Sequence, residues 1–294
     1  IKSIIPYLYE SDSVDLRGAT SEMEKNIKQP IGKAQAEASG WVPLDGEVFP
    51  VYRGYHCCVY SVESKTVPAD WINANLKRKT KQFETQNGRK PSKDEKAEMK
   101  EMLIAEALPR CFPKTTETPI IFNSKDNLIL IGAGSHTGSE KALAAMRGVL
   151  GSLPATLPSG HKDKPVELLL KDWLINGSIP PEIGRPGHLC ELKGEDDDSS
   201  ISFKKHDLEE EEVVNHLVAG GKSVTALEIL SSDGLTYRLT KDIVLKGLKF
   251  DIDASDFGDE EPDSALTAMY IIGSMVSHEI KKLDKEIISL SPDD

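Results

Sequence analysis

The segment between Pro68 and Pro113 constrains the fold most strongly, because it places two basic helices inside a chain otherwise rich in short strands. Apolar side chains recur at helical spacing on both sides of Asn87-Gly88, where the pattern breaks. After the break, Ser92 and Glu95 have the spacing of a capping box, which marks the start of a second helix. The sequence therefore predicts a protruding helical hairpin.

Charge is distributed unevenly along the chain. The net charge of the 294 residues is −12, and this total argues against a general polyanion binder, because phosphate binding is carried by Lys and Arg. However, residues 71–114 hold eleven Lys/Arg against six Asp/Glu, whereas residues 195–212 hold nine acids against two lysines. Charge segregated in this way predicts one basic surface on an acidic body that repels DNA elsewhere.

The remaining segments indicate the α+β class. Strands are expected at 4–9, 55–62, 119–122, 128–131, 166–170, 223–230 and 235–239. Helices are expected at 139–150, from an N-cap at Asp207 to Gly220-Gly221, and over 264–290. Since strands and helices come in blocks rather than in strict alternation, we expect mixed or antiparallel sheets with helices.

Composition narrows the class of protein. Apolar residues make up 38% and charged residues 29%, which is typical of a globular chain. No run approaches the roughly 18 apolar residues of a membrane span, and the N-terminus lacks the features of a secretory signal. Four cysteines without C-x-x-C spacing indicate reduced thiols, so we expect a cytoplasmic protein that does not bind membranes.

Two segments suggest enzyme sites but are better explained otherwise. Gly132 to Gly138 follows a strand and opens a helix, yet its spacing is one residue off the dinucleotide pattern, so we interpret it as a strand-to-helix turn. The acidic run 195–198 splays consecutive carboxylates apart, whereas a nuclease metal needs carboxylates that converge, so we interpret it as a solvated loop. No catalytic residue, cofactor or metal is predicted.

Basic side chains are the stronger candidates for a binding site. On the hairpin the candidate DNA contacts are Lys77, Arg78, Lys81, Arg89 and Lys90. Further along, Lys204-Lys205 precede the expected helix at Asp207, whose N-terminus favours anions. Four glutamates at 209–212 oppose that preference, so the geometry decides between the two effects.

Several motifs follow one another in a fixed order along the chain: Gly40-Trp41-Val42-Pro43, Leu108-Pro109-Arg110-Cys111-Phe112, Leu150-Gly151-Ser152-Leu153-Pro154, Lys204-Lys205-His206-Asp207-Leu208, Asn215-His216 and Lys222. In this order and spacing they resemble the RdgC family over about residues 20–240. The resemblance implies an elongated monomer in three parts: a tip at 71–115, a centre formed by 1–70 with 116–165, and a base at 166–294. It also implies a homodimer closed into a ring around DNA.

The resemblance implies the following function and site residues. Such a protein would bind double- and single-stranded DNA with little sequence preference, hinder loading of a RecA-type recombinase, and lie on the nucleoid. Arg110, Lys205, His206 and Lys222, together with Arg89, would face either DNA or the gate between the two subunits. His206 replaces the family's usual amide, which would make this contact pH-sensitive. Phe112 would close the interface between the two tips. The last helix is the candidate for a second dimer contact because of its apolar stripe, which includes Leu266, Met269, Ile272 and Met275.

Two other functions remain open. A metal-dependent nuclease acting in recombination would need carboxylates such as Asp172 or Asp207 to converge near the basic surface. A protein-binding adaptor would instead use the acidic loops, and its behaviour would be insensitive to salt.

Overall fold

The computed structural model describes residues 1–160, 165–194, 196–251, 264–284 and 288–289. The chain divides into two compact units, which are described separately. Unit 1 comprises Ile1–Met23, Pro43–Val59 and Thr118–Asp294, and unit 2 comprises Glu24–Val42 and Tyr60–Glu117. The predicted α+β class is confirmed, with a large antiparallel sheet and helices, whereas the division into tip, centre and base stays a prediction. None of the described helices combines the length and apolar content that a bilayer crossing requires.

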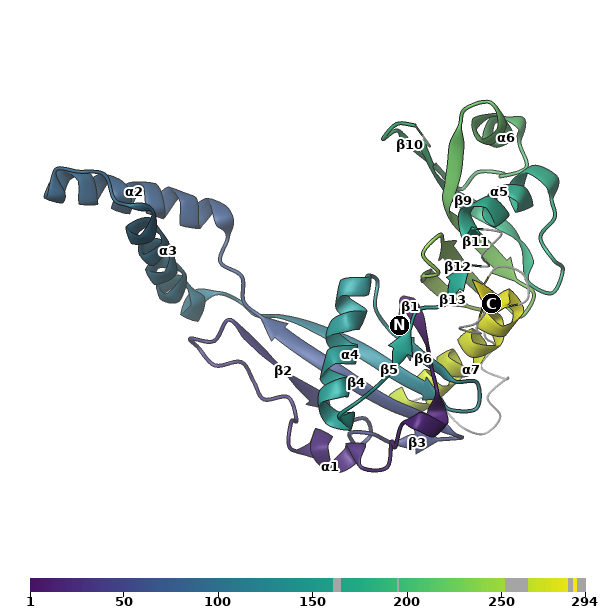
Figure 1. Cartoon of the computed structure of the whole chain (residues 1–294), viewed down its shortest axis with the longest axis horizontal. Helices are drawn as coiled ribbons and strands as arrows, with labels where there is room; N and C mark the ends of the chain where they lie inside the picture. Colours follow the sequence, from purple (N-terminus) through teal and green to yellow (C-terminus); the bar gives the residue numbers. More distant parts are fainter. Residues whose placement is uncertain (161–164, 195, 252–263, 285–287, 290–294) are drawn as a thin grey trace. The chain divides into compact units, whose positions relative to one another are not determined.

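Unit 2 contains the predicted helical hairpin (Figure 1). Its helices are α2 (Ala69–Asn87) and α3 (Lys93–Ala107), which pack against each other and are followed by a 3-10 turn, η2 (Leu108–Arg110). Gly88 ends α2 in the left-handed conformation, with φ 65°, which glycine adopts without steric cost. The predicted capping box is confirmed, because Ser92 Oγ accepts from the Glu95 amide and the Glu95 carboxylate accepts from the Ser92 amide at 2.7 Å.

The non-helical part of unit 2 is centred on Trp41, which is 2% exposed. Trp41 lies near the end of β2 (Glu37–Val42), and its ring lies 5.1 Å from that of Tyr60 in β4 (Tyr55–Ser64). The preceding Gly40 lies so close to another segment that a Cβ there would be 2.6 Å from the Asn26 carbonyl oxygen and the Lys28 amide. The Gly-Trp pair therefore has a packing role in this unit.

Unit 1 is built on an antiparallel sheet with strand order β10-β9-β11-β12-β13-β1-β6-β5-β4. The bounds are β10 (Ser200–Lys204), β9 (Gly184–Gly194), β11 (Lys222–Ser231), β12 (Leu235–Thr240), β13 (Leu245–Phe250), β1 (Ser3–Tyr9), β6 (Leu128–Ile131) and β5 (Lys114–Asn123). Four short strands complete the unit: β3 (Val51–Tyr52), β7 (Ala155–Thr156), β8 (Ser159–Gly160) and β14 (Ile288–Ser289). The predicted hairpins β5–β6 and β11–β12 are confirmed.

The helices of unit 1 have bounds η1 (Ser11–Ser13), α1 (Ala19–Glu24), α4 (His136–Leu150), α5 (Val166–Asn176), α6 (Glu211–Val218) and α7 (Ala265–Asp284). The interpretation of Gly132 to Gly138 as a strand-to-helix turn is confirmed, because it joins β6 to α4. The predicted last helix ends at Asp284, and Ile288–Ser289 form strand β14 instead of helix. Residues 285–287 and 290 of that prediction lie outside the described residues.

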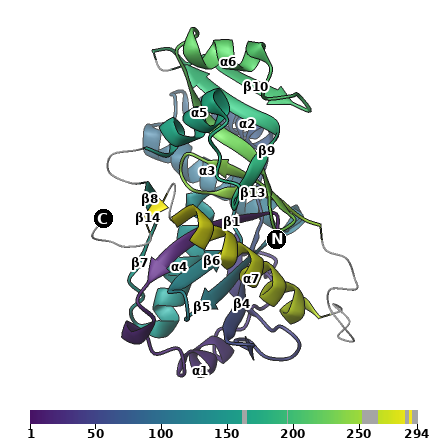
Figure 2. The same ribbon diagram turned by 90° about the vertical axis from the view of Figure 1, so that its right-hand side faces the viewer.

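Helices α4 and α7 cover opposite faces of the part of the unit 1 sheet that β1, β6 and β5 form (Figures 1 and 2). The hydroxyl groups of Tyr7 in β1 and Ser139 in α4 form a hydrogen bond of 2.8 Å. Ile121 of β5 contacts the other helix, since a Cβ on Gly273 of α7 would lie 2.9 Å from it. The core is therefore a sheet packed between two amphipathic helices.

Two further predictions of elements are wrong. Residues 166–170 form the start of helix α5 rather than a strand, because Val166, Leu169, Leu170, Trp173 and Leu174 are buried at helical spacing. Asp207 is not an N-cap, since α6 begins at Glu211 with Glu210 as its N-cap. Asp207 instead accepts a hydrogen bond from the Glu209 amide at 3.0 Å. This local turn places the N-cap three residues later than predicted, at Glu210.

A buried carboxylate ties α7 to the sheet. Glu279 is 1% exposed and accepts hydrogen bonds from Tyr237 Oη at 2.8 Å and Ser231 Oγ at 2.7 Å. Lys282 Nζ lies 3.3 Å from the same carboxylate and also pairs with Asp233. The network meets the requirement that a buried charge be paired and hydrogen-bonded.

Candidate nucleic-acid interface

One face of the C-terminal half of α2 is lined by cationic, amide and hydroxyl side chains. A shallow groove of about 320 Å³ runs along it and is lined by Arg78, Lys81, Gln82, Thr85 and Gln86. These positions recur at intervals of three and four residues, so they share one side of the helix. We name this group the α2 outer face. It offers a row of flexible donors to a line of phosphate oxygens, and the predicted contact Lys77 is exposed on the same helix.

Arg89, by contrast, holds the hairpin together. Its guanidinium forms two hydrogen bonds with the Glu95 carboxylate, at 2.6 and 2.8 Å, and lies 5.0 Å from the centre of the Phe83 ring. The arrangement links the end of α2 to the capping box of α3. The positive charge of Arg89 is therefore paired with the Glu95 carboxylate. Lys90 next to it is exposed. Its DNA contact, like that of Arg89, stays a prediction.

The Arg89–Glu95 pair makes the hairpin sensitive to acid. The two hydrogen bonds from Arg89, with those from Ser92, lower the pKa of Glu95 to about 2. Because this pKa is depressed on folding, the stabilisation is present above the ordinary carboxyl pKa and is lost as the pH falls from there towards 2. We expect an NMR titration of the Glu95 carboxyl to give a midpoint near 2, and Arg89→Gln to raise it towards the ordinary range, with the hydrogen bonds from Ser92 still lowering the pKa. A wild-type midpoint near 4 would contradict the pairing in solution.

Arg110 and Phe112 follow the hairpin, in and beyond η2. Arg110 is exposed, and Phe112 is 95% exposed. An aromatic side chain held in water is typical of a surface that a partner covers. The dimer contact assigned to Phe112 stays a prediction.

In unit 1, Lys204, Lys205 and His206 lie together where β10 ends. Both lysines are exposed, and Lys205 has a left-handed backbone with φ 55°. The His206 amide donates to the His188 carbonyl at 3.2 Å, and His188 Nδ1 lies 3.3 Å from the His206 carbonyl oxygen. This two-way contact with β9 fixes the turn on which the lysines are presented.

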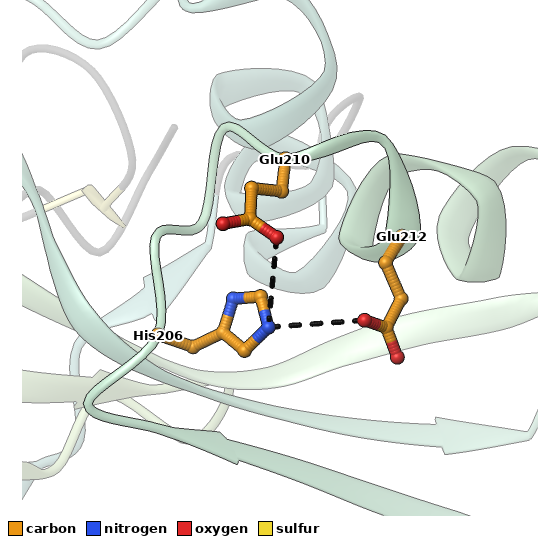
Figure 3. Close-up of side chains that lie close together, drawn as sticks. All are labelled: His206, Glu210 and Glu212. Atoms are coloured by element: carbon orange, nitrogen blue, oxygen red, sulfur yellow. Dashed lines mark ion pairs between the residues drawn. The ribbon is translucent and has the colours of Figure 1, made fainter.

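The His206 ring points at the start of α6 (Figure 3). Its Nε2 lies 3.8 Å from a carboxylate oxygen of Glu210 and 3.8 Å from one of Glu212. Its Nδ1 is 2.8 Å from the Asp207 carbonyl oxygen, and this hydrogen bond, with the nearby carboxylates, raises the pKa of His206. Whether the DNA contact depends on pH stays a prediction.

Lys222 lies apart from Lys204 and Lys205. Its Nζ donates to Ser199 Oγ at 2.5 Å, and Lys222 is opposite Gly194 at the far end of the β9–β10 hairpin. The length of β10, four residue steps or about 13 Å, separates the two ends. The predicted base contacts therefore form two groups along one hairpin rather than one cluster.

Sequence reasoning missed a set of strand-borne cations. Tyr237 faces α7, so the neighbouring Arg238 points to the opposite, solvated face of the sheet. Arg238 lies opposite Lys246 in the neighbouring strand β13. It also forms an ion pair of 2.9 Å with Glu191 of β9, so Glu191 lies on the same face. Because β10 pairs with β9, alternate residues of both strands belong to this face. We name this the open sheet face. Its cations are Lys193, Lys204, Arg238, Lys246 and Lys249.

The four α7 residues predicted for the dimer interface differ in burial. Met269 is 5% exposed within its own unit, whereas Leu266, Ile272 and Met275 are half-buried. Much of the apolar stripe of α7 therefore packs on the sheet of unit 1. An interface role for the half-buried residues stays a prediction.

The carboxylates named for a nuclease do not converge. Asp172 accepts hydrogen bonds from Asn176 and Ser178 on the surface. Among the described residues, one group of potential metal ligands has its ligand atoms within 4.8 Å of one another: His206, Glu210 and Glu212. Glu195 of the acidic run lies outside the described residues.

Comparisons with known proteins agree with one another. A family model described as "RdgC: Putative exonuclease, RdgC" matches residues 1–290. The Recombination-associated protein RdgC of Mannheimia succiniciproducens is 33% identical over 243 residues, covering 80% of this chain and 79% of that protein. The protein of the same name from Shewanella oneidensis is 34% identical over 222 residues, covering 74% and 72%. That of Haemophilus influenzae is 32% identical over 240 residues, covering 80% and 78%.

Proposed function

We propose, from the premise that the chain belongs to the RdgC family, that it is a recombination-associated protein that binds DNA without sequence preference. In this proposal a ring-shaped homodimer encircles duplex DNA, binds single strands as well, and hinders the loading of a RecA-type recombinase on the nucleoid in the cytoplasm. The protein performs no chemistry on the DNA.

One observation carries the proposal: two surfaces of a chain whose net charge is −12 each group several cations. The α2 outer face and the open sheet face present Lys and Arg beside Gln, Thr and Ser, which suit phosphate oxygens. Cations on these surfaces release counterions from the DNA backbone, whereas the acidic remainder repels it. Such contacts position a protein on DNA without reading its bases.

Ring closure requires surfaces for a second copy of the chain. Phe112 is the most exposed large apolar side chain named in the described residues, and it follows the hairpin directly. A bare Phe inserted into a partner pocket is a typical interface hot spot. The half-buried Leu266, Ile272 and Met275 of α7 are the candidates for the second contact.

Retention on closed circular DNA tests the ring. We expect the protein to stay on an immobilised circular plasmid in salt that removes it from linear DNA, and to be released when one restriction cut linearises the plasmid. Phe112→Asp should abolish this retention, whereas Met102→Asp, on the exposed surface of α3, should leave it intact. Equal wash-off from circular and linear DNA would contradict encirclement.

A second candidate is an exonuclease, which the description of the family model names. The specific observation in its favour is the convergence of His206, Glu210 and Glu212 beside Lys204 and Lys205. Incubating end-labelled linear duplex with the protein and Mg²⁺ or Mn²⁺ distinguishes the candidates. We expect intact DNA, and progressive shortening that disappears in Glu210→Gln would favour the exonuclease.

A further inference from the structure

The surroundings of Lys204 and Lys205 contain opposite charges in close proximity. Asp207 and the four glutamates 209–212 follow the two lysines within seven residues. In the described part of the chain, Glu210 and Glu212 have no Lys or Arg partner, and both aim a carboxylate oxygen at His206. Carboxylates without a Lys or Arg partner beside the turn that carries these lysines would repel the phosphates that the lysines attract.

The three side chains converge in a way that suits a metal ion. His206 Nε2 lies 3.8 Å from each carboxylate, and all three ligand atoms are within 4.8 Å of one another (Figure 3). Ligands that bind Zn²⁺ at about 2.0–2.2 Å are separated by roughly 3.5 Å at tetrahedral angles, so small side-chain movements would close the set. The ligands come from two elements, the turn after β10 and the first turn of α6.

The orientation of His206 supports the same conclusion. Its Nδ1 is within hydrogen-bonding distance of the Asp207 carbonyl, and a proton on Nδ1 leaves the lone pair of Nε2 facing Glu210 and Glu212. Metal-binding histidines are ordinarily oriented in this way, through a hydrogen bond from the other ring nitrogen to a carbonyl or carboxylate. The ring is also held by an edge contact with Phe203, whose centre is 5.3 Å away, and the backbone by His188.

We propose that His206, Glu210 and Glu212 bind a divalent ion of the Zn²⁺ type, with an open coordination position towards solvent. An imidazole with two carboxylates is a mixed nitrogen and oxygen ligand set, which Zn²⁺ accepts and which Mg²⁺ and Ca²⁺ disfavour relative to oxygen alone. The ion neutralises the two carboxylates beside Lys204 and Lys205, so they no longer repel a phosphate. The open position accepts water or a phosphate oxygen.

Calorimetric titration of the full chain with Zn²⁺ tests the site without any use of DNA. We expect one Zn²⁺ to bind per chain. We expect the double variant Glu210→Gln, Glu212→Gln to bind Zn²⁺ at least about tenfold more weakly. The matched control is Glu209→Gln with Glu211→Gln, which removes the same charge from the same turn without touching a ligand. An equal loss in both variants would show diffuse attraction to an acidic helix end and overturn the proposal. So would the absence of saturable binding.

A third variant separates the imidazole from the carboxylates. His206→Gln keeps a polar side chain of similar length but removes the nitrogen ligand. We expect it to weaken Zn²⁺ binding more than the weak Mg²⁺ binding, because only the transition metal favours imidazole. Unchanged Zn²⁺ affinity in this variant would overturn the assignment of His206.

The contribution to phosphate binding rests on the proposed function and is measured separately. We expect Zn²⁺ to raise the affinity for duplex DNA over that measured with chelator, and this increment to vanish in Glu210→Gln with Glu212→Gln. Saturable Zn²⁺ binding with no change in DNA affinity would overturn the phosphate contact and leave the metal site standing. A protein that binds Zn²⁺ but no DNA under either condition would instead refute the proposed function.

Discussion

Arg78→Glu combined with Lys81→Glu is expected to weaken duplex binding by roughly one to two orders of magnitude near 0.1 M salt. Both cations lie on the α2 outer face, where the guanidinium of Arg78 is held by Asn75 at 2.9 Å but keeps further donors for a phosphate. Removing one cation from the DNA phosphates lowers the slope of log affinity against log salt by about 0.9. The double variant should therefore lose about two units of slope, measured by fluorescence anisotropy over a salt series.

The control must remove the same charge from elsewhere on the molecule. Lys33→Glu with Lys125→Glu does so at two exposed lysines outside both candidate surfaces. We expect this variant to keep the wild-type slope and most of the affinity, because the acidic body does not approach the DNA. Equal curves for the two double variants would mean that only net charge matters, and the α2 outer face would lose its assignment.

Arg89 is unsuitable for this experiment, although its sequence position makes it a predicted DNA contact. Its guanidinium is bound to Glu95 by two hydrogen bonds, and Glu95 also completes the capping box with Ser92. Arg89→Glu would place two carboxylates at that point and disturb the hairpin itself. Weaker DNA binding in that variant would not distinguish the removal of a phosphate-binding cation from the unfolding of the hairpin.

Local signals in the sequence predicted the hairpin correctly. The Ser92 and Glu95 spacing, the Asn87-Gly88 break and the apolar periodicity all depend on neighbours within a few residues, and the structure confirms each. The error at 166–170 has the opposite cause. Val166 to Leu170 is a short apolar run whose helical nature is clear only with Trp173 and Leu174, which continue the buried stripe.

The open sheet face could not be predicted in the same way, because it depends on strand pairing between distant segments. Lys246 and Arg238 become neighbours through the β12–β13 register, and Lys193 joins them only through β9 and β11. Within β12 and β13, Arg238 follows the buried Tyr237 and Lys246 follows the buried Leu245, so each points away from the core. That signal marks them as solvated, but the sequence does not show that they share a surface with Lys204.

Glu279→Ala is expected to lower the free energy of unfolding by about 3 kcal/mol, a large part of the stability of an ordinary domain. The substitution leaves the hydroxyl of Tyr237, a fully buried residue, without its acceptor and removes one of two anionic partners of Lys282. Burial, reinforced by the charge of Glu279, raises the pKa of Tyr237 well above its usual value, so the phenol remains a donor that needs an acceptor. Chemical denaturation followed by circular dichroism measures the change.

Two further variants assign the loss to the network rather than to a cavity. Glu279→Gln keeps an acceptor for Tyr237 and similar volume, so we expect a smaller loss than in Glu279→Ala. Tyr237→Phe removes the donor alone and should cost about 1–2 kcal/mol. Because both side chains belong to one hydrogen bond of 2.8 Å, the loss in the Tyr237→Phe, Glu279→Ala double variant should fall short of the sum by at least about 0.5 kcal/mol. Strict additivity would mean that the Tyr237 hydroxyl finds another partner in solution, and the Tyr237–Glu279 hydrogen bond would then not be what holds α7 to the sheet.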